Sequence, residues 1–174
     1  DLSDLRALIY DAARQAGFDL CGIAPVDLPD GHVRHWEQWL DAGRHGEMAY
    51  MARPERADLR QLVPWVKSVI CLGLNYWLPP SEDAAAAKVG RGVPSGMISV
   101  YAQGQDYHDV MKRRMGQLLD SLFQQLPAGF EAGFEAKIYI DTGAILERAY
   151  ATGAGLGWIG KNTCLINEQR GSYF

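Results

Sequence analysis

An acid stands where an apolar segment ends, a position at which a carboxyl group can take part in chemistry. Asp141 follows residues 136–140, which read as a short strand, and precedes a helix predicted over 144–153. A carboxylate there can cap the helix by accepting hydrogen bonds from its first backbone amides. It can also lie at the edge of a cleft where strand ends meet ligands. Glu147 and Arg148 are expected to be a structural ion pair or surface charges.

A glycine-rich segment follows this acid. It contains Gly155, Gly157, Trp158, Gly160, Lys161 and Asn162. Glycine allows a backbone to approach a flat ligand closely, and exposed amides can bind polar substituents or phosphate. The segment does not match the phosphate-binding loop GxxxxGK[ST], because its spacing differs and Asn162 follows Lys161. The alternative is a glycine-rich turn around a buried tryptophan.

A third group of polar residues opens the longest predicted helix, over 106–126. Asp106 is a good N-cap, which places Tyr107 and His108 in the first helical turn. These two side chains either serve the structure or line a binding site. The apolar stripe along the same helix, which includes Met111 and Leu118, is predicted to be core.

The remaining elements must position these groups. Helices are expected at 4–16, with Ser3 as a cap, and at 33–40; strands are expected at 18–24, 67–75 and 163–167. Residues 78–96 read as a long surface loop. No GxGxxG follows the first strand, which disfavours a dinucleotide-binding parallel sheet. The pattern predicts one α+β domain over 1–174, with a mixed or antiparallel sheet flanked by helices.

Composition narrows the function classes. The chain has 174 residues, is 48% hydrophobic and carries a net charge of −4, so a strongly basic nucleic-acid binder is not expected. No apolar run approaches the roughly 20 residues of a membrane-spanning helix. The three cysteines are far apart and none lies in a CxxC motif, so we expect buried thiols, no metal ligands in this chain and a cytoplasmic location.

Six segments stand in a characteristic order along almost the whole chain. They are His45-Gly46-Glu47-Met48, Met51-Ala52-Arg53, Ser68-Val69-Ile70, Tyr101-Ala102-x-Gly104-x-Asp106-Tyr107-His108, Asp141-Thr142-Gly143-x-Ile145-Leu146-Glu147-Arg148 and Ala154-Gly155-Leu156-Gly157-Trp158-x-Gly160-Lys161. Together they resemble the epoxyqueuosine reductase family.

That resemblance implies a fold, an activity and cofactors. The fold is a nitroreductase-like corrinoid-binding domain, and the activity is reduction of epoxyqueuosine to queuosine in tRNA, the last step of queuosine biosynthesis. The implied cofactors are cobalamin and two 4Fe-4S clusters, the latter held by a ferredoxin-like module that this chain does not contain. The fragment alone should therefore be inactive. The implied partners are the tRNA anticodon loop and an electron donor protein or reductant, and we expect a monomer.

The resemblance also assigns roles to residues. It implies that Asp141 is the proton donor, and its apolar flanks permit the burial that keeps a carboxylic acid protonated near pH 7. Tyr107 and His108 would line the corrinoid pocket. The glycine-rich segment, from Gly155, Gly157 and Trp158 to Gly160, Lys161 and Asn162, would lie against the corrinoid. Two alternatives are another cobalamin-dependent reductase, such as a reductive dehalogenase, and a corrinoid-binding module without catalysis of its own.

Overall fold

A computed structural model describes residues 2–77, 98–126 and 133–174 of the protein. The loop expected at 78–96 lies outside these residues. The helices of the described part are α1 (Leu2–Gln15), α2 (Asp30–Asp41), α4 (Tyr107–Gln125) and α5 (Glu147–Gly153). Its strands are β1 (Leu20–Pro25), β2 (Ser68–Gly73), β3 (Trp158–Ile159) and β4 (Leu165–Ile166). Short 3-10 helices lie between 49 and 61 and at 100–102.

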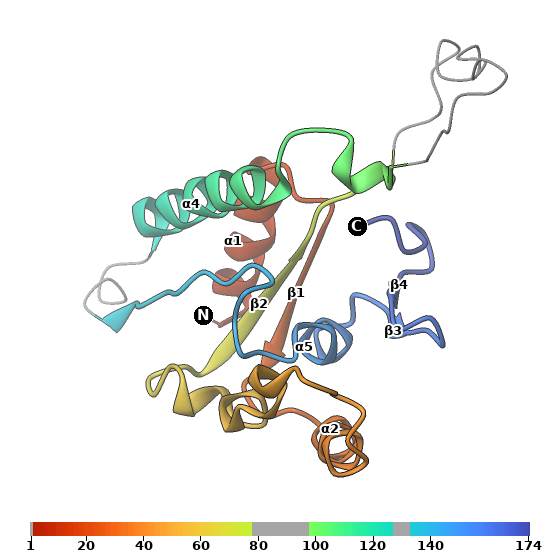
Figure 1. The fold of residues 1–174 in the computed structure, drawn as a ribbon. Coiled ribbons are helices and arrows are strands. Elements are labelled where there is room, and N and C mark those ends of the chain that lie inside the picture. The colour runs from red at the N-terminus through yellow and green to blue at the C-terminus, as the bar shows by residue number, and fades with distance from the viewer. Residues whose placement is uncertain (1, 78–97, 127–132) are drawn as a thin grey trace, which may run out of the picture.

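The centre of the fold is an antiparallel pair of strands. β1 pairs with β2 from Leu20 opposite Gly73 to Pro25 opposite Ser68. Both strands are rich in apolar residues, and because side chains alternate along a strand, each strand presents apolar groups on two faces. A second, smaller antiparallel pair joins β3 to β4. Figure 1 shows the long pair running between the helices, with the small hairpin beside α5.

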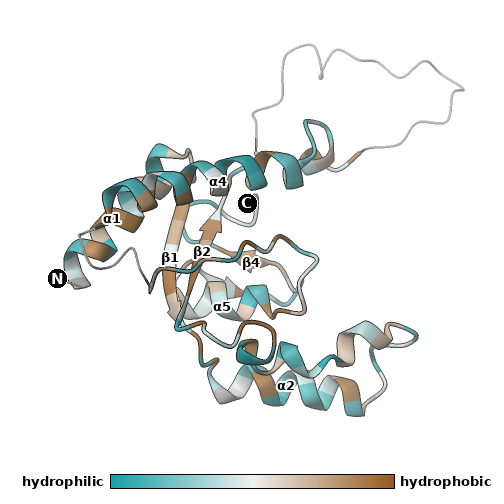
Figure 2. Cartoon of the chain, turned by 90° about the vertical axis from the view of Figure 1, so that its left-hand side faces the viewer, coloured by the Kyte–Doolittle hydropathy of each residue, from teal (hydrophilic) through white to brown (hydrophobic). Residues whose placement is uncertain are grey.

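Helices cover both faces of the long strand pair. On one face, α1 and α4 pack together around Ala13 and Leu122, against which Ile23 and Ile70 pack. On the other face, α5 contributes Tyr150 to a cluster with Ala24 of β1. Hydrophobic colour accordingly concentrates on β1 and β2 and alternates with hydrophilic colour along α1 (Figure 2). This layering agrees with the predicted α+β class.

Gly22 allows α5 to approach the strands closely. A Cβ atom on Gly22 would lie 2.4 Å from the backbone oxygen of Ala154, just after α5. No side chain fits at that distance, so only glycine allows this packing. α5, which begins at the candidate site, is thereby held against the backbone of β1.

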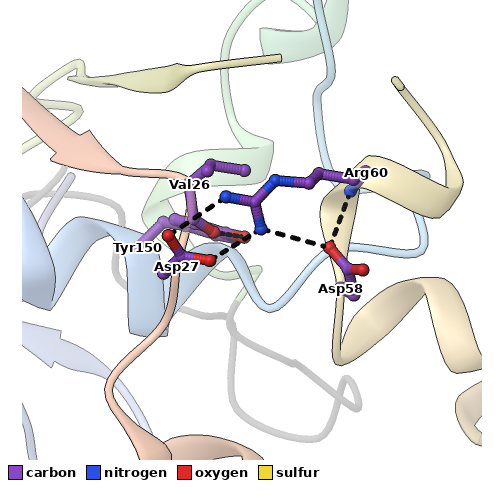
Figure 3. Close-up of polar contacts among 5 residues, drawn as sticks. All are labelled: Val26, Asp27, Asp58, Arg60 and Tyr150. Carbon is purple, nitrogen blue, oxygen red and sulfur yellow. Dashed lines mark hydrogen bonds and ion pairs between the residues drawn. The ribbon is translucent and has the colours of Figure 1, made fainter. Parts of the chain in front are cut away.

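Polar contacts at the end of β1 fasten it to α5 and to a 3-10 turn (Figure 3). The buried hydroxyl of Tyr150 donates a hydrogen bond to the carbonyl oxygen of Val26 at 2.8 Å, and burial raises the pKa of Tyr150 to about 12. Beside it, Arg60 contacts the Asp27 carboxylate at 2.6 and 3.0 Å and lies 3.7 Å from Asp58. This ion-pair group is exposed.

Several sequence predictions need correction. Residues 136–140 are not a strand in the structure; their side chains instead help to line a cavity with α4 and β2. The last helix begins at Glu147 rather than 144, and Ser3 lies inside α1. Cys164 is exposed, whereas burial raises the pKa of the Cys71 thiol to about 12.

The other predicted helices and strands are confirmed to within a few residues. Within the part of the chain that the structure describes, none of the helices has the length and apolar character needed to cross a membrane.

Candidate active site

The first turn of α4 fixes Tyr107 and His108. Asp106 caps the helix, as the sequence predicts: its Oδ1 accepts a hydrogen bond from the backbone N–H of His108 at 2.9 Å. The same oxygen lies 2.8 Å from Nδ1 of the His108 ring. The backbone bond, followed by the ring contact, lowers the pKa of Asp106. The Tyr107 and His108 rings stack with centroids 4.1 Å apart.

Asp141 meets these two side chains from 34 residues away along the chain. The Tyr107 hydroxyl donates a hydrogen bond to Oδ2 of Asp141, and Nε2 of His108 lies 4.0 Å from the same oxygen. The bond to Asp141 raises the pKa of Tyr107 to about 12, because losing the phenolic proton would remove the donor and set two negative charges together. The structure therefore brings Tyr107, His108 and Asp141 into one cluster.

The backbone of Asp141 adopts an uncommon conformation. Its φ angle is 54°, in the left-handed region, which costs a residue with a side chain roughly 1–2 kcal/mol. Aspartate enters this region more readily than most residues, because its short polar side chain bonds locally. Such strained backbone concentrates at functional sites, and here it holds a carboxylate against Tyr107.

Asp141 does not cap a helix, so the reading of a plain N-cap is wrong, and it does not have the burial that its apolar flanks permit. A tight turn follows it, in which the N–H of Thr142 donates to the carbonyl of Ile140 at 2.5 Å. α5 begins only at Glu147, after Leu146, whose side chain makes no capping bond. The Asp141 side chain is 56% exposed, so it is open to water as well as to Tyr107.

Glu147 is the site residue that sequence reasoning missed. It is half-buried at the first position of α5 and lines a cavity of about 360 Å³ together with Tyr107 and Asp141. Burial, and then the charge of Asp141, raise the pKa of Glu147. The expected ion pair with Arg148 is absent from the described contacts, since Arg148 donates instead to the backbone oxygen of Thr163. The signal in the sequence is an acid directly after the apolar pair Ile145-Leu146.

The glycine-rich segment forms the β3–β4 hairpin. Gly155 has a φ of 77°, with open space where a side chain would be. A Cβ on Gly157 would lie 2.1 Å from the backbone oxygen of Ile166, and one on Gly160 would lie 2.6 Å from the Ile166 side chain. Gly157 and Gly160 thus allow β4 to pack against β3.

Trp158 is exposed, so the alternative of a turn around a buried tryptophan is wrong. Trp158 and Ile159 are 51% and 40% exposed, and as neighbours on β3 they point to opposite faces of the hairpin. Lys161 and Asn162 follow in an exposed turn, where Oδ1 of Asn162 accepts a hydrogen bond from the N–H of Cys164 at 3.2 Å. Among the described residues, no hydrogen bond or ion pair joins this hairpin to the Tyr107–Asp141 cluster.

A row of tyrosine rings, not foreseen from the sequence, runs from the last residues of the chain to this cluster. Tyr173 packs edge-on against Tyr76, Tyr76 against Tyr101, and Tyr101 against Tyr107, with centroids 6.0–6.3 Å apart. Edge-to-face packing of this kind is a favourable aromatic arrangement. The Tyr107 ring therefore contacts two other rings, that of Tyr101 at the end of this row and that of His108.

Comparisons with known proteins give a consistent family. The family model "Epoxyqueuosine reductase QueG, DUF1730" matches residues 56–142. An epoxyqueuosine reductase of Pseudomonas aeruginosa is 40% identical over 177 residues, covering 100% of this chain and 46% of the relative. The corresponding protein of Gloeobacter violaceus is 42% identical over 168 residues, covering 96% and 49%. The chain thus spans about half the length of these relatives.

Solved structures show the same fold. A selenomethionine-labelled epoxyqueuosine reductase superimposes with a TM-score of 0.78 at 23% identity, over 99% of this chain and 44% of the other. Another, solved with an epoxyqueuosine-modified tRNA stem loop, gives a TM-score of 0.73 at 23% identity, over 99% and 44%. The family model matches half of the residues of this chain, and the fold of the chain agrees with that of solved members. This chain therefore belongs to the epoxyqueuosine reductase family.

Proposed function

We propose that this chain is the part of an epoxyqueuosine reductase that binds the corrinoid and donates protons to the substrate. The full-length protein would reduce the epoxide of epoxyqueuosine in tRNA to the alkene of queuosine. The observation that carries the proposal is the convergence of Tyr107, His108 and Asp141 in a chain of this family. The overall reaction consumes two electrons and two protons, and the epoxide oxygen leaves as water.

Asp141 is the proposed proton donor. The departing oxygen needs a proton as its C–O bond breaks, and a carboxylic acid within hydrogen-bond reach supplies it. The strained turn holds Asp141 toward the first turn of α4. Tyr107 orients the carboxyl group and donates a hydrogen bond to the carboxylate that remains after proton transfer, and His108 lies beside it.

The described residues fit a corrinoid. When bound, cobalamin supplies the electron-transfer chemistry that the protein side chains lack. The exposed indole of Trp158 suits packing against a flat macrocycle. The open space at Gly155 lets the macrocycle approach the hairpin, Gly157 and Gly160 keep β3 and β4 packed beneath it, and we assign polar contacts with its side-chain amides to Lys161 and Asn162.

The residues that bind the clusters, and most of those that contact the tRNA, are proposed to lie in the remainder of the full-length protein. No group of three His, Cys, Asp or Glu side chains is arranged for a metal in the described part of the chain; we assign the two 4Fe-4S clusters to the remainder of the full-length protein. A relative of this fold is solved with a tRNA stem loop, and we infer the same substrate here. With a net charge of −4, we assign most phosphate contacts to that remainder as well. With a tRNA substrate, we also infer a cytoplasmic location.

The decisive test uses the full-length protein, reconstituted with cobalamin, clusters and a reductant. We expect it to convert epoxyqueuosine in tRNA to queuosine, measured by mass spectrometry of the nucleosides. Asp141→Asn should slow conversion by roughly 10²–10⁴-fold without changing the bound cobalamin. Conversion at the wild-type rate would eliminate Asp141 as the donor, and a loaded wild type that leaves the epoxide intact would eliminate the function.

The corrinoid surface is tested separately by titrating cobalamin and following its visible spectrum. Trp158→Glu should weaken binding, because it replaces the apolar indole with a charge. Tyr50→Glu is the matched control, since Tyr50 is 53% exposed and lies in a 3-10 turn away from the hairpin sequence. An equal loss of cobalamin affinity in both variants would show that β3 is not part of the corrinoid site.

A further inference from the structure

Two carboxyl groups share the cavity beside Tyr107. Asp141 sits in the strained turn and is 56% exposed, whereas Glu147 is half-buried at the start of α5. Both line the same cavity of about 360 Å³. Partial burial of a carboxyl group disfavours its ionised form, because ionisation away from water is costly.

The surroundings of Glu147 favour its protonated form. After burial, the charge of Asp141 and a hydrogen bond with its side chain raise the pKa of Glu147. A hydrogen bond with the Asp141 backbone and the charge of Arg56 act in the opposite direction. Arg56 itself donates to the carbonyl of Ile145 at 3.3 Å, and Cys71 is the remaining titratable group that senses Glu147. Among these neighbours, Asp141 is the acid that lines the same cavity and whose charge acts on Glu147.

The chemistry of the proposed reaction needs two protons at one oxygen atom. Opening the epoxide breaks one C–O bond and converts the oxygen to a hydroxyl group, which takes one proton. Forming the alkene breaks the second C–O bond and releases water, which takes another. One carboxyl group carries one proton, so Asp141 must be reprotonated between the two steps.

We propose that Glu147 is the positioning residue that returns a proton to Asp141 within each turnover. This inference rests on the proposed function. Asp141 first gives its proton to the epoxide oxygen; the Glu147 O–H bond then breaks as the Asp141 O–H bond forms again; and Asp141 gives this second proton to the departing hydroxyl. The two electrons come from the reductant through the cobalamin and clusters of the full-length protein. Glu147 regains its proton from solvent after water has left.

The test compares the full-length wild type with Glu147→Gln and Glu147→Asp in single-turnover reactions over a range of pH. Glu147→Gln should slow the formation of queuosine, which needs the second proton, by about 100-fold, with unchanged cobalamin content and tRNA affinity. Glu147→Asp, which keeps the acid, should recover part of the rate. The wild-type rate should fall as pH rises through the raised pKa of Glu147, and Glu147→Gln should lack that limb. Glu37→Gln, an exposed acid on α2, is the control that should leave rate and profile unchanged.

An infrared titration provides a readout that does not depend on turnover. The carbonyl stretch of a protonated carboxylic acid should persist above the usual glutamic acid range in the wild type and in Asp141→Asn, and it should vanish in Glu147→Gln. A band that survives Glu147→Gln, or an unchanged rate in that variant, would overturn the relay. A wild type that shows the band but never reduces epoxyqueuosine would overturn the proposed function instead.

Discussion

The carboxylate of Asp141 raises the proton affinity of the Tyr107 hydroxyl. Asp141→Asn removes the negative acceptor, so the pKa of Tyr107 should fall from about 12 toward the ordinary tyrosine value of about 10. Carbon-13 NMR of labelled tyrosine rings measures this, with Tyr107→Phe to assign the signal. Tyr150 is the internal control, because burial rather than Asp141 raises its pKa to about 12. Equal shifts of both tyrosines would show that the substitution disturbs the fold.

For individual residues, the sequence singled out three members of the candidate site but did not indicate which side chains there are buried. Asp141, Tyr107 and His108 were found because motif order marks them. The apolar flanks of Asp141 permit burial, yet the structure exposes Asp141 and half-buries Glu147. Burial depends on which segment folds over a residue. Sequence flanks do not contain that information, because the cavity wall comes from α4 and β2.

In the β3–β4 hairpin, glycine is required for two different reasons: Gly157 for close packing and Gly155 for its positive φ angle. Gly157→Ala places a Cβ 2.1 Å from a backbone oxygen and should destabilise the chain by about 3 kcal/mol. Gly155→Ala meets open space and bears only the cost of its φ of 77°, about 1 kcal/mol. Urea unfolding of the 174-residue chain measures both. Equal losses would mean that β4 does not pack on β3 as described.

Helices and long strands were predictable because their signals are local. The apolar stripe and the Asp106 cap define α4, and the apolar runs define β1 and β2. The 136–140 segment has the same apolar character, yet it forms no ladder in the structure. An apolar run becomes a strand only if the backbone of another strand pairs with it. The partner strand comes from another part of the chain, so the run itself does not reveal whether one is present.

Across the whole molecule, the contact of Tyr150 with Val26 joins residues 124 positions apart. Tyr150→Phe removes a buried hydrogen bond and leaves a carbonyl without its donor, which should cost about 1–3 kcal/mol. Arg60→Met removes the neighbouring exposed ion pairs and should lower the free energy of unfolding less than Tyr150→Phe does, because water screens exposed ion pairs. Urea unfolding at low and high salt distinguishes them, because only the Arg60 contribution is screened. A larger loss of unfolding free energy in Arg60→Met than in Tyr150→Phe would contradict this prediction.

The two-sided covering of β1 has a consequence during synthesis. One face of β1 is covered by α4 and the other by α5, and both helices leave the ribosome long after the strand. At about 5–20 residues per second, the nascent chain waits on the order of ten seconds before α5 emerges. Until then the apolar edge and faces of β1 are open to chaperones and to neighbouring nascent chains. Translation speed through the segment before α5 therefore bears on the yield of folded protein.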